Sequence, residues 1–439
     1  MSSSSRSLGA AGPLGRRTAL VMRSGTVVAS AVALMIGATA ARGASWQFNP
    51  RLELGGTYDD NYLLAEQPES QAAVTGPFID AQLAILAQTP SSSFELDPEV
   101  HSTLYPGNSE DQSTDGYLNV LDSISTPRSQ TRLQGSYANQ TIAAADLVPA
   151  TFPGVQLGQP TISGSGVVEQ LERQQTIHLF PSTSYAWSPR DHLNFGIDYY
   201  RASFDSDVAD QVGFQSFGGN VGIAYDATQR STLSLRGQYS VFAPQGDLPN
   251  AEHGGLDGEW DFRETQILTL YVRAGAGITS GKRTGVAGGD ISVGDFEGGL
   301  GARWTFQVTD VVFDLLRTAV PSSFGILVNE NEARLRITHR FTERFAGFVA
   351  VRGLNTEEAV SSVAAVPDRN YVTGSTGIEW RITHDFSIDA SYTYTWQKYS
   401  PAPLQSYAAS NAFGLSVVYE PYREKELPQL STVGGGSPY

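Results

Sequence analysis

The chain has 439 residues, no cysteine, 45 glycines and a formal net charge of −16. The lack of cysteine excludes a disulfide framework and thiol chemistry, and the acidic excess disfavours nucleic acid as a partner, because such a surface repels phosphates. No stretch after the N-terminal segment holds 18 consecutive apolar residues, so the sequence predicts no transmembrane helix.

The N-terminal segment has the pattern of a secretory signal. A group of arginines precedes a short apolar run, which ends at Ala38-Thr39-Ala40, a match to the A-x-A cleavage site. The apolar run is too short to favour the alternative, a membrane anchor. We therefore predict that residues 1–40 are a signal peptide and that the exported chain begins at Ala41.

The rest of the chain repeats one unit: an alternating strand, a tight polar turn, a second alternating strand and a longer polar loop. The first strand begins near Trp46, and alternation continues to about residue 420. Each tight turn lies between two alternating runs, as in a β-hairpin. The predicted turns are 89–91, 126–128, 188–191, 226–230, 263–265, 308–310, 342–344 and 383–385.

Longer polar segments separate the hairpins. Eight turns and nine loops connect 18 strands, an even number that places both termini on the short-turn side, as in outer-membrane barrels. The segments 115–125 and 254–263 alternate weakly, so 16 to 20 strands are compatible with the pattern. The predicted loops are 59–75, 105–114, 143–174, 205–212, 244–253, 279–292, 321–328, 355–371 and 399–409.

The two faces of the strands differ in character. In the strand after residue 385, Phe386, Ile388, Tyr394 and Trp396 share one face, whereas serines, threonines and an aspartate share the other. An apolar face with aromatic residues near its ends is typical of a surface in contact with lipid. The alternative, a soluble β-sandwich, would need far more strands than such a domain usually has.

The sequence therefore predicts an all-β, transmembrane up-and-down antiparallel β-barrel over residues 41–420, in the outer membrane of a Gram-negative bacterium. Residues 421–439 are expected to form a flexible periplasmic tail. The same alternation assigns charged residues to the lumen. These candidates are Arg236, Arg273, Arg303, Arg334, Arg336, Arg340, Arg352, Arg381, Asp80, Glu95, Asp97 and Glu99.

The lumen is thus expected to be acidic on its early strands and basic on its late strands. Two interpretations remain open. The charges could neutralise one another in a wet interior, or the arginines could guide an anionic solute, since arginine rings favour anion passage and the guanidinium binds carboxylates in a bidentate manner. The longest loop, 143–174, could fold inward as a constriction or lie outside.

No catalytic or metal-binding pattern is found. The six histidines form no nucleophile or metal-ligand cluster, and no H-x-x-x-H spacing occurs. Asp59, Asp60 and Asn61 have the oxygen ligands that Ca²⁺ prefers, but an ordinary acidic loop is the favoured interpretation. We therefore predict that the chain is not an enzyme and has no metal or cofactor.

Three motifs resemble a family of Gram-negative outer-membrane β-barrels found with exopolysaccharide and exosortase-type loci: PRLELGGTYDDN (50–61), FELDPEV (94–100) and TPRSQTRLQGSY (126–137). The resemblance covers about the first quarter of the mature chain. It implies a passive conduit for a secreted polymer and periplasmic polysaccharide-export components as partners. The last strand, with Gly414 and Tyr419, looks like a barrel-assembly signal, although a tail of 20 residues follows it.

Three functions follow as hypotheses. The first is an outer-membrane channel that exports an extracellular polysaccharide, the second is a general or small-solute porin, and the third is a structural or adhesive barrel whose loops bind outside the cell. In each case the expected partners are outer-membrane lipid and lipopolysaccharide together with the barrel-assembly machinery, and nucleic acid is excluded by charge.

Overall fold

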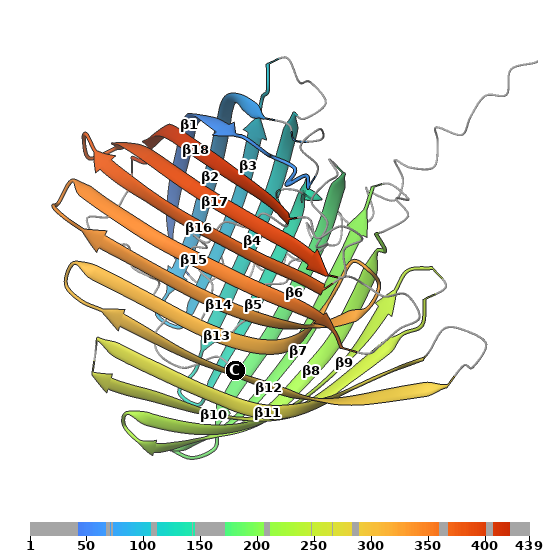
Figure 1. The fold of residues 1–439 in the computed structure, drawn as a ribbon. Coiled ribbons are helices and arrows are strands. Elements are labelled where there is room, and N and C mark those ends of the chain that lie inside the picture. The colour runs from blue at the N-terminus through green and yellow to red at the C-terminus, as the bar shows by residue number, and fades with distance from the viewer. Residues whose placement is uncertain are drawn as a thin grey trace, which may run out of the picture.

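The computed structural model shows one closed sheet of 18 antiparallel strands (Figure 1). It describes residues 43–66, 71, 73–106, 112–142, 144, 172–205, 211–246, 248–265, 267–282, 289–359, 368–400 and 407–421. The predicted signal peptide, all but the first residue of the predicted tail, and almost all of the predicted loop 143–174 lie outside these residues. Within the described part of the chain, no helix is long and apolar enough to cross a membrane.

The strands follow one another around the barrel in chain order. They are β1 (Ser45–Asp59), β2 (Val74–Thr89), β3 (Ser92–Thr103), β4 (Ser113–Ser125), β5 (Ser129–Thr141), β6 (Arg173–Ala186), β7 (Asp191–Phe204), β8 (Phe214–Thr228), β9 (Ser231–Pro244), β10 (Ala251–Thr265), β11 (Leu268–Lys282), β12 (Asp290–Thr305), β13 (Thr309–Pro321), β14 (Leu327–Arg340), β15 (Phe345–Glu358), β16 (Asp368–Arg381), β17 (Phe386–Ser400) and β18 (Tyr407–Tyr419).

The last strand closes the sheet onto the first. β1 pairs with β2 along one edge and with β18 along the other, where Leu52 lies opposite Tyr419. Closure leaves no free strand edge, so every strand finds backbone partners on both sides. The predicted up-and-down barrel and the count of 18 strands are confirmed. In Figure 1, β10–β18 cross in front of β2–β9.

The two segments with weak alternation are both strands. β4 covers 113–125 and β10 covers 251–265, each hydrogen-bonded to neighbours on both sides. Three predicted turns are displaced along the chain. Residues 226–228 of the turn 226–230 belong to β8, and residues 309–310 of the turn 308–310 belong to β13. All of 263–265 belongs to β10, and that turn comes after Thr265. A register shift between Arg263 and Thr265 extends this strand, because an irregular pairing absorbs an extra residue that alternation alone places in the turn.

Threonine and serine residues close the short turns in a repeated manner. Thr89 Oγ1 accepts a hydrogen bond from the Ser92 backbone N–H at 2.9 Å, and Thr126 Oγ1 accepts one from Ser129 at the same distance. Ser188 Oγ accepts one from the Asp191 N–H at 3.1 Å. A hydroxyl that binds the backbone three residues later stabilises a turn locally, which explains why these hairpins can be recognised in the sequence.

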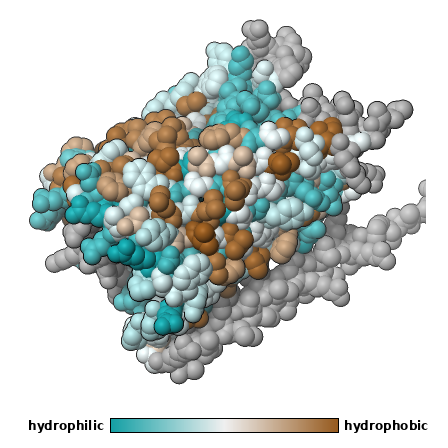
Figure 2. Space-filling model, turned by 90° about the horizontal axis from the view of Figure 1, so that it is seen from below, coloured by the Kyte–Doolittle hydropathy of each residue, from teal (hydrophilic) through white to brown (hydrophobic). Residues whose placement is uncertain are grey.

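The outer face of the wall is apolar and exposed. On β8, Phe217 is 60% exposed, and Val221, Ile223 and Tyr225 on the same face are also exposed, whereas Ser216 on the opposite face is buried. Figure 2 shows hydrophobic side chains gathered across the middle of the wall and hydrophilic ones towards its ends. A closed barrel with an exposed apolar exterior and a polar interior is suited to a bilayer.

Candidate functional site

The candidate site is the inner wall of the barrel, the face opposite the exposed apolar one. On β14, Leu335 and Ile337 belong to the outer face and Arg334 and Arg336 to the inner one. Strand register carries this assignment around the sheet, because residues directly opposite one another lie on the same face. By this rule Arg236, Arg273, Arg303, Arg334, Arg336, Arg340, Arg352, Arg381, Asp80, Glu95, Asp97 and Glu99 all lie on the inner face.

Inward arginines on β9 and β11 are paired with acids of β10. Arg236 Nε lies 3.0 Å from Asp257 Oδ2, and Arg273 lies 3.8 Å from the other oxygen of the same carboxylate. Arg273 also binds Glu259 at 2.5 Å. The three strands therefore share one network in which each guanidinium faces at least one carboxylate.

A second network spans β11 to β15. Asp314 accepts hydrogen bonds from Arg334 and from the hydroxyl of Tyr271. Arg352 Nε donates to Glu332 at 2.6 Å, and both side chains are only 1% exposed. Buried ions of opposite sign compensate one another's lost hydration, so this network belongs to the wall of the barrel.

The late strands are therefore not a basic surface. Arg381 is paired with Glu379 at 2.9 Å, and the networks above pair four more of the predicted arginines. The prediction of a basic late wall is wrong, because it counted the arginines without the acids of the same parity on the same and neighbouring strands. The acids that it missed are Asp257, Glu259, Asp314, Glu332 and Glu379. Alternation alone could have identified Glu332 as an inward acid, because it lies on the same face of its strand as Arg334.

The early strands remain acidic. The inward carboxylates Glu95, Asp97 and Glu99 on β3 form no ion pair with a basic residue of the described chain; Asp97 accepts hydrogen bonds from the Gln82 amide at 2.9 and 3.0 Å. Asp80 lies 3.7 Å from Arg51 and 3.2 Å from His101. The inward carboxylates of β1–β4 are Glu53, Asp59, Asp80, Glu95, Asp97, Glu99 and Asp115. Arg51 pairs with Glu53 and Asp80, and Arg173 of β6 lies 3.4 Å from Asp115.

The loop after β1 folds onto the inner wall. Leu64, with 0% exposure, packs against Leu354, Tyr371 and Ala408 of β15, β16 and β18. Its backbone has a positive φ of 47°, a conformation that costs energy in a non-glycine residue and persists only where surrounding contacts hold it. Asn61 supplies such contacts: its side chain binds the backbone of Ala65 through both amide atoms, at 3.0 and 3.1 Å.

The acidic residues that begin this loop anchor it to β18. Asp59 Oδ1 accepts hydrogen bonds from the Asn61 N–H at 2.8 Å and from Ser410 Oγ at 2.5 Å. Asp60 accepts two from Asn411, each at 2.7 Å. These bonds give Asp59, Asp60 and Asn61 a structural role. Among the described residues, no group of three His, Asp or Glu side chains is arranged to hold a metal ion.

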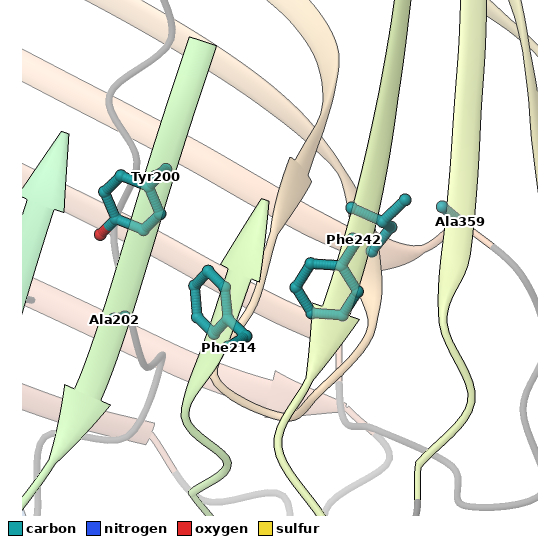
Figure 3. Packing of buried hydrophobic residues seen from close by; sticks show 6 residues of the cluster. Tyr200, Ala202, Phe214, Phe242 and Ala359 are labelled. Atoms are coloured by element: carbon teal, nitrogen blue, oxygen red, sulfur yellow. The ribbon is translucent and has the colours of Figure 1, made fainter. Parts of the chain in front are cut away.

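A second loop also folds inward, at the tip of the β13–β14 hairpin. The Val212 N–H, just before β8, donates to the Ser323 carbonyl at 2.7 Å. Leu327 and Ala359 join a buried cluster with Tyr200, Phe214 and Phe242 of β7, β8 and β9. Figure 3 shows the three aromatic side chains side by side. The sequence places 321–328 among the outer loops, because nothing local distinguishes a loop that bends into the lumen. The prediction that loop 143–174 folds inward or lies outside falls almost entirely on residues outside the described part of the chain.

Comparisons with known proteins find no matching family model and no matching curated protein. Similar solved structures include OccK2 (OpdF) of Pseudomonas aeruginosa in complex with glucuronate, with 11% identity, 86% of this chain and 98% of that chain covered, and a TM-score of 0.42. OpdK of the same organism has 12% identity, with 85% and 98% covered and a TM-score of 0.41. A loop-deletion mutant of OmpT from Vibrio cholerae has 11% identity, with 86% and 99% covered and a TM-score of 0.34. These likenesses are too distant to carry a functional argument.

Proposed function

We propose that this chain is an outer-membrane channel of a Gram-negative bacterium that passes small solutes by diffusion and prefers cations. One observation carries the proposal: the inward carboxylates of β3 form no ion pair with a basic residue of the described chain, whereas most inward arginines are paired with acids. Eighteen-stranded barrels are wide enough for an aqueous channel. Rings of Asp and Glu favour cation passage, so the uncompensated charge sets the preference.

Export of an anionic polysaccharide, which the sequence resemblance implies, is a weaker hypothesis for this lumen. A path that guides a polyanion needs guanidinium groups free to bind it. Here five of the eight predicted arginines are already paired with acids, which are Asp257, Glu259, Asp314, Glu332 and Glu379. Lipopolysaccharide and lipid around the apolar wall, and the barrel-assembly machinery, remain the partners that the proposal needs.

The test is the reversal potential of the purified barrel in a planar bilayer under a KCl gradient. We expect the native channel to pass K⁺ in preference to Cl⁻. The triple variant Glu95→Gln/Asp97→Asn/Glu99→Gln should lower the permeability ratio several-fold, because it removes the acids without basic partners while keeping their size. Glu343→Gln, in the exposed turn between β14 and β15, is the matched control and should leave the ratio unchanged.

Two results would count against the proposal. An absence of conductance in the native protein would contradict the proposed channel function itself. A native preference for Cl⁻, or an unchanged reversal potential in the triple variant, would show that the acids of β3 do not set the charge preference. If only the double variant Arg334→Ala/Arg336→Ala changed the permeability ratio, the arginines and not the acids of β3 would set the charge preference.

A further inference from the structure

We infer that the tip of the β13–β14 hairpin, residues 322–326, is a displaceable gate across the mouth of the lumen. The docked tip defines a narrow state of the channel, and its release defines a wide one. This inference rests on the proposed channel function and adds its regulation. The tip is called the gate segment below, and the residues 211–213 that receive it are called the latch.

The gate segment reaches its latch across the lumen and not along the wall. β9 and β14 are separated in the sheet by four strands, β10 to β13. Nevertheless Leu327 at the start of β14 belongs to one buried cluster with Phe214 and Phe242 of β8 and β9, and the Ser323 carbonyl accepts a hydrogen bond from the Val212 N–H at 2.7 Å. Contact between such distant strands requires the hairpin end to bend inward over the opening.

The gate segment has a compact shape of its own. The Gly325 N–H donates to the Ser322 carbonyl at 3.0 Å, and the Ser322 N–H donates to the Ile326 carbonyl at 3.0 Å. Gly325 has a φ of 77°, a conformation that glycine adopts without steric cost. A self-bonded turn can move as one unit, because its own backbone bonds survive when the contact with the latch is lost.

Opposing contributions balance the docked state. Burial of Leu327, the residue that directly follows the gate segment, holds this end of the hairpin against aromatic rings and favours docking. Against it, Ser323 Oγ and both side-chain amide atoms of Gln211 are buried without a hydrogen-bond partner, which is unfavourable because water would satisfy them. One backbone hydrogen bond joins the gate segment to the latch among the described residues. Undocking therefore returns these buried polar groups to water, where they can form hydrogen bonds.

A disulfide provides the direct test, because the chain contains no cysteine of its own. A Cβ atom placed at Gly325 would lie 3.4 Å from Val212 Cβ, close to the separation of about 3.5–4.5 Å found in disulfides. It would also lie 2.4 Å from Leu248 Cδ1, the end of a flexible side chain, which must rotate away. The variant Val212→Cys/Gly325→Cys should cross-link when oxidised. Its single-channel conductance should then stay in one low state, and reductant should restore openings at least twofold larger.

Controls separate the gate from the channel. Each single cysteine variant should show no dependence on reductant. A verified cross-link with equal conductance before and after reduction would overturn the gate, and so would failure of the cross-link to form. An absence of conductance in the native and reduced proteins would instead reject the proposed channel. Liposome uptake of sugars of increasing size should show a lower size limit in the oxidised double variant.

Discussion

Replacement of Arg352 with alanine is expected to destabilise the barrel by about 3–5 kcal/mol, the usual cost of removing one partner of a buried ion pair. Arg352 and Glu332 are each 1% exposed and lie 2.6 Å apart, and Glu330 is buried on the same strand as Glu332. Without the guanidinium, the carboxylate of Glu332 keeps only the longer contact with Arg334 Nε, at 3.9 Å, and remains buried near another acid. The free energy of unfolding should fall because the folded state then holds buried negative charge that has lost its closest counterion.

The measurement is the urea midpoint of the folded, heat-modifiable band on SDS gels after refolding into lipid vesicles. Arg381→Ala is the matched control, because Arg381 and its partner Glu379 are each 23% exposed, and exposed pairs contribute little. The double variant Glu332→Gln/Arg352→Met removes both charges and should recover much of the lost stability. Equal midpoints for Arg352→Ala and Arg381→Ala would show that the pair is not buried in the folded protein.

Substitution of Gly275 with alanine is the second change with a large expected effect. Its Cβ would lie 2.6 Å from the Leu256 carbonyl oxygen and 2.6 Å from Asp257 Cβ on β10. A backbone neighbour cannot rotate away, so β10 and β11 must separate locally, at a cost of about 1–3 kcal/mol for overpacking. The displacement also moves Asp257, which holds Arg236 and Arg273.

Gly281→Ala is the matched control on the same strand and the same face. The nearest atom to its Cβ would be Ala251 Cβ at 3.9 Å, an ordinary contact, so the substitution should be neutral or slightly stabilising, because alanine loses less conformational freedom on folding than glycine. The urea midpoint of each variant should be compared in lipid. A lower midpoint for Gly281→Ala than for Gly275→Ala would contradict the close approach of β10 and β11 at residue 275.

The strands and their two faces could be read from the sequence because both are local properties. Alternation in β8 places Phe217 and Val221 on one face whatever the neighbouring strands are. Hydroxyl-closed turns such as the one at Thr126 mark where hairpins begin. The charged candidates of the lumen, including Arg334 and Glu99, follow from the same parity.

The partners of those charges could not be read from the sequence. Arg352 meets Glu332 only because β14 and β15 pair in one particular register, and a change of one residue would send one of them to the outer face. Nothing in the sequence distinguishes Gly275 from Gly281, although one lies against backbone and the other in ordinary contact. Register is decided by all hydrogen bonds of the closed sheet together.

Whether a loop folds into the lumen also depends on contacts between strands that are distant in the sequence. The β1–β2 loop carries Leu64, and the β13–β14 hairpin carries Ser323, but each finds its contacts on strands far away in the chain. Alternation along the chain, a property of each residue and its neighbours, was sufficient for the 18-stranded barrel and its polar interior. The neutralised late wall, the acidic early wall and the inward gate segment depend on closure of the barrel, which brings residues of distant strands into contact.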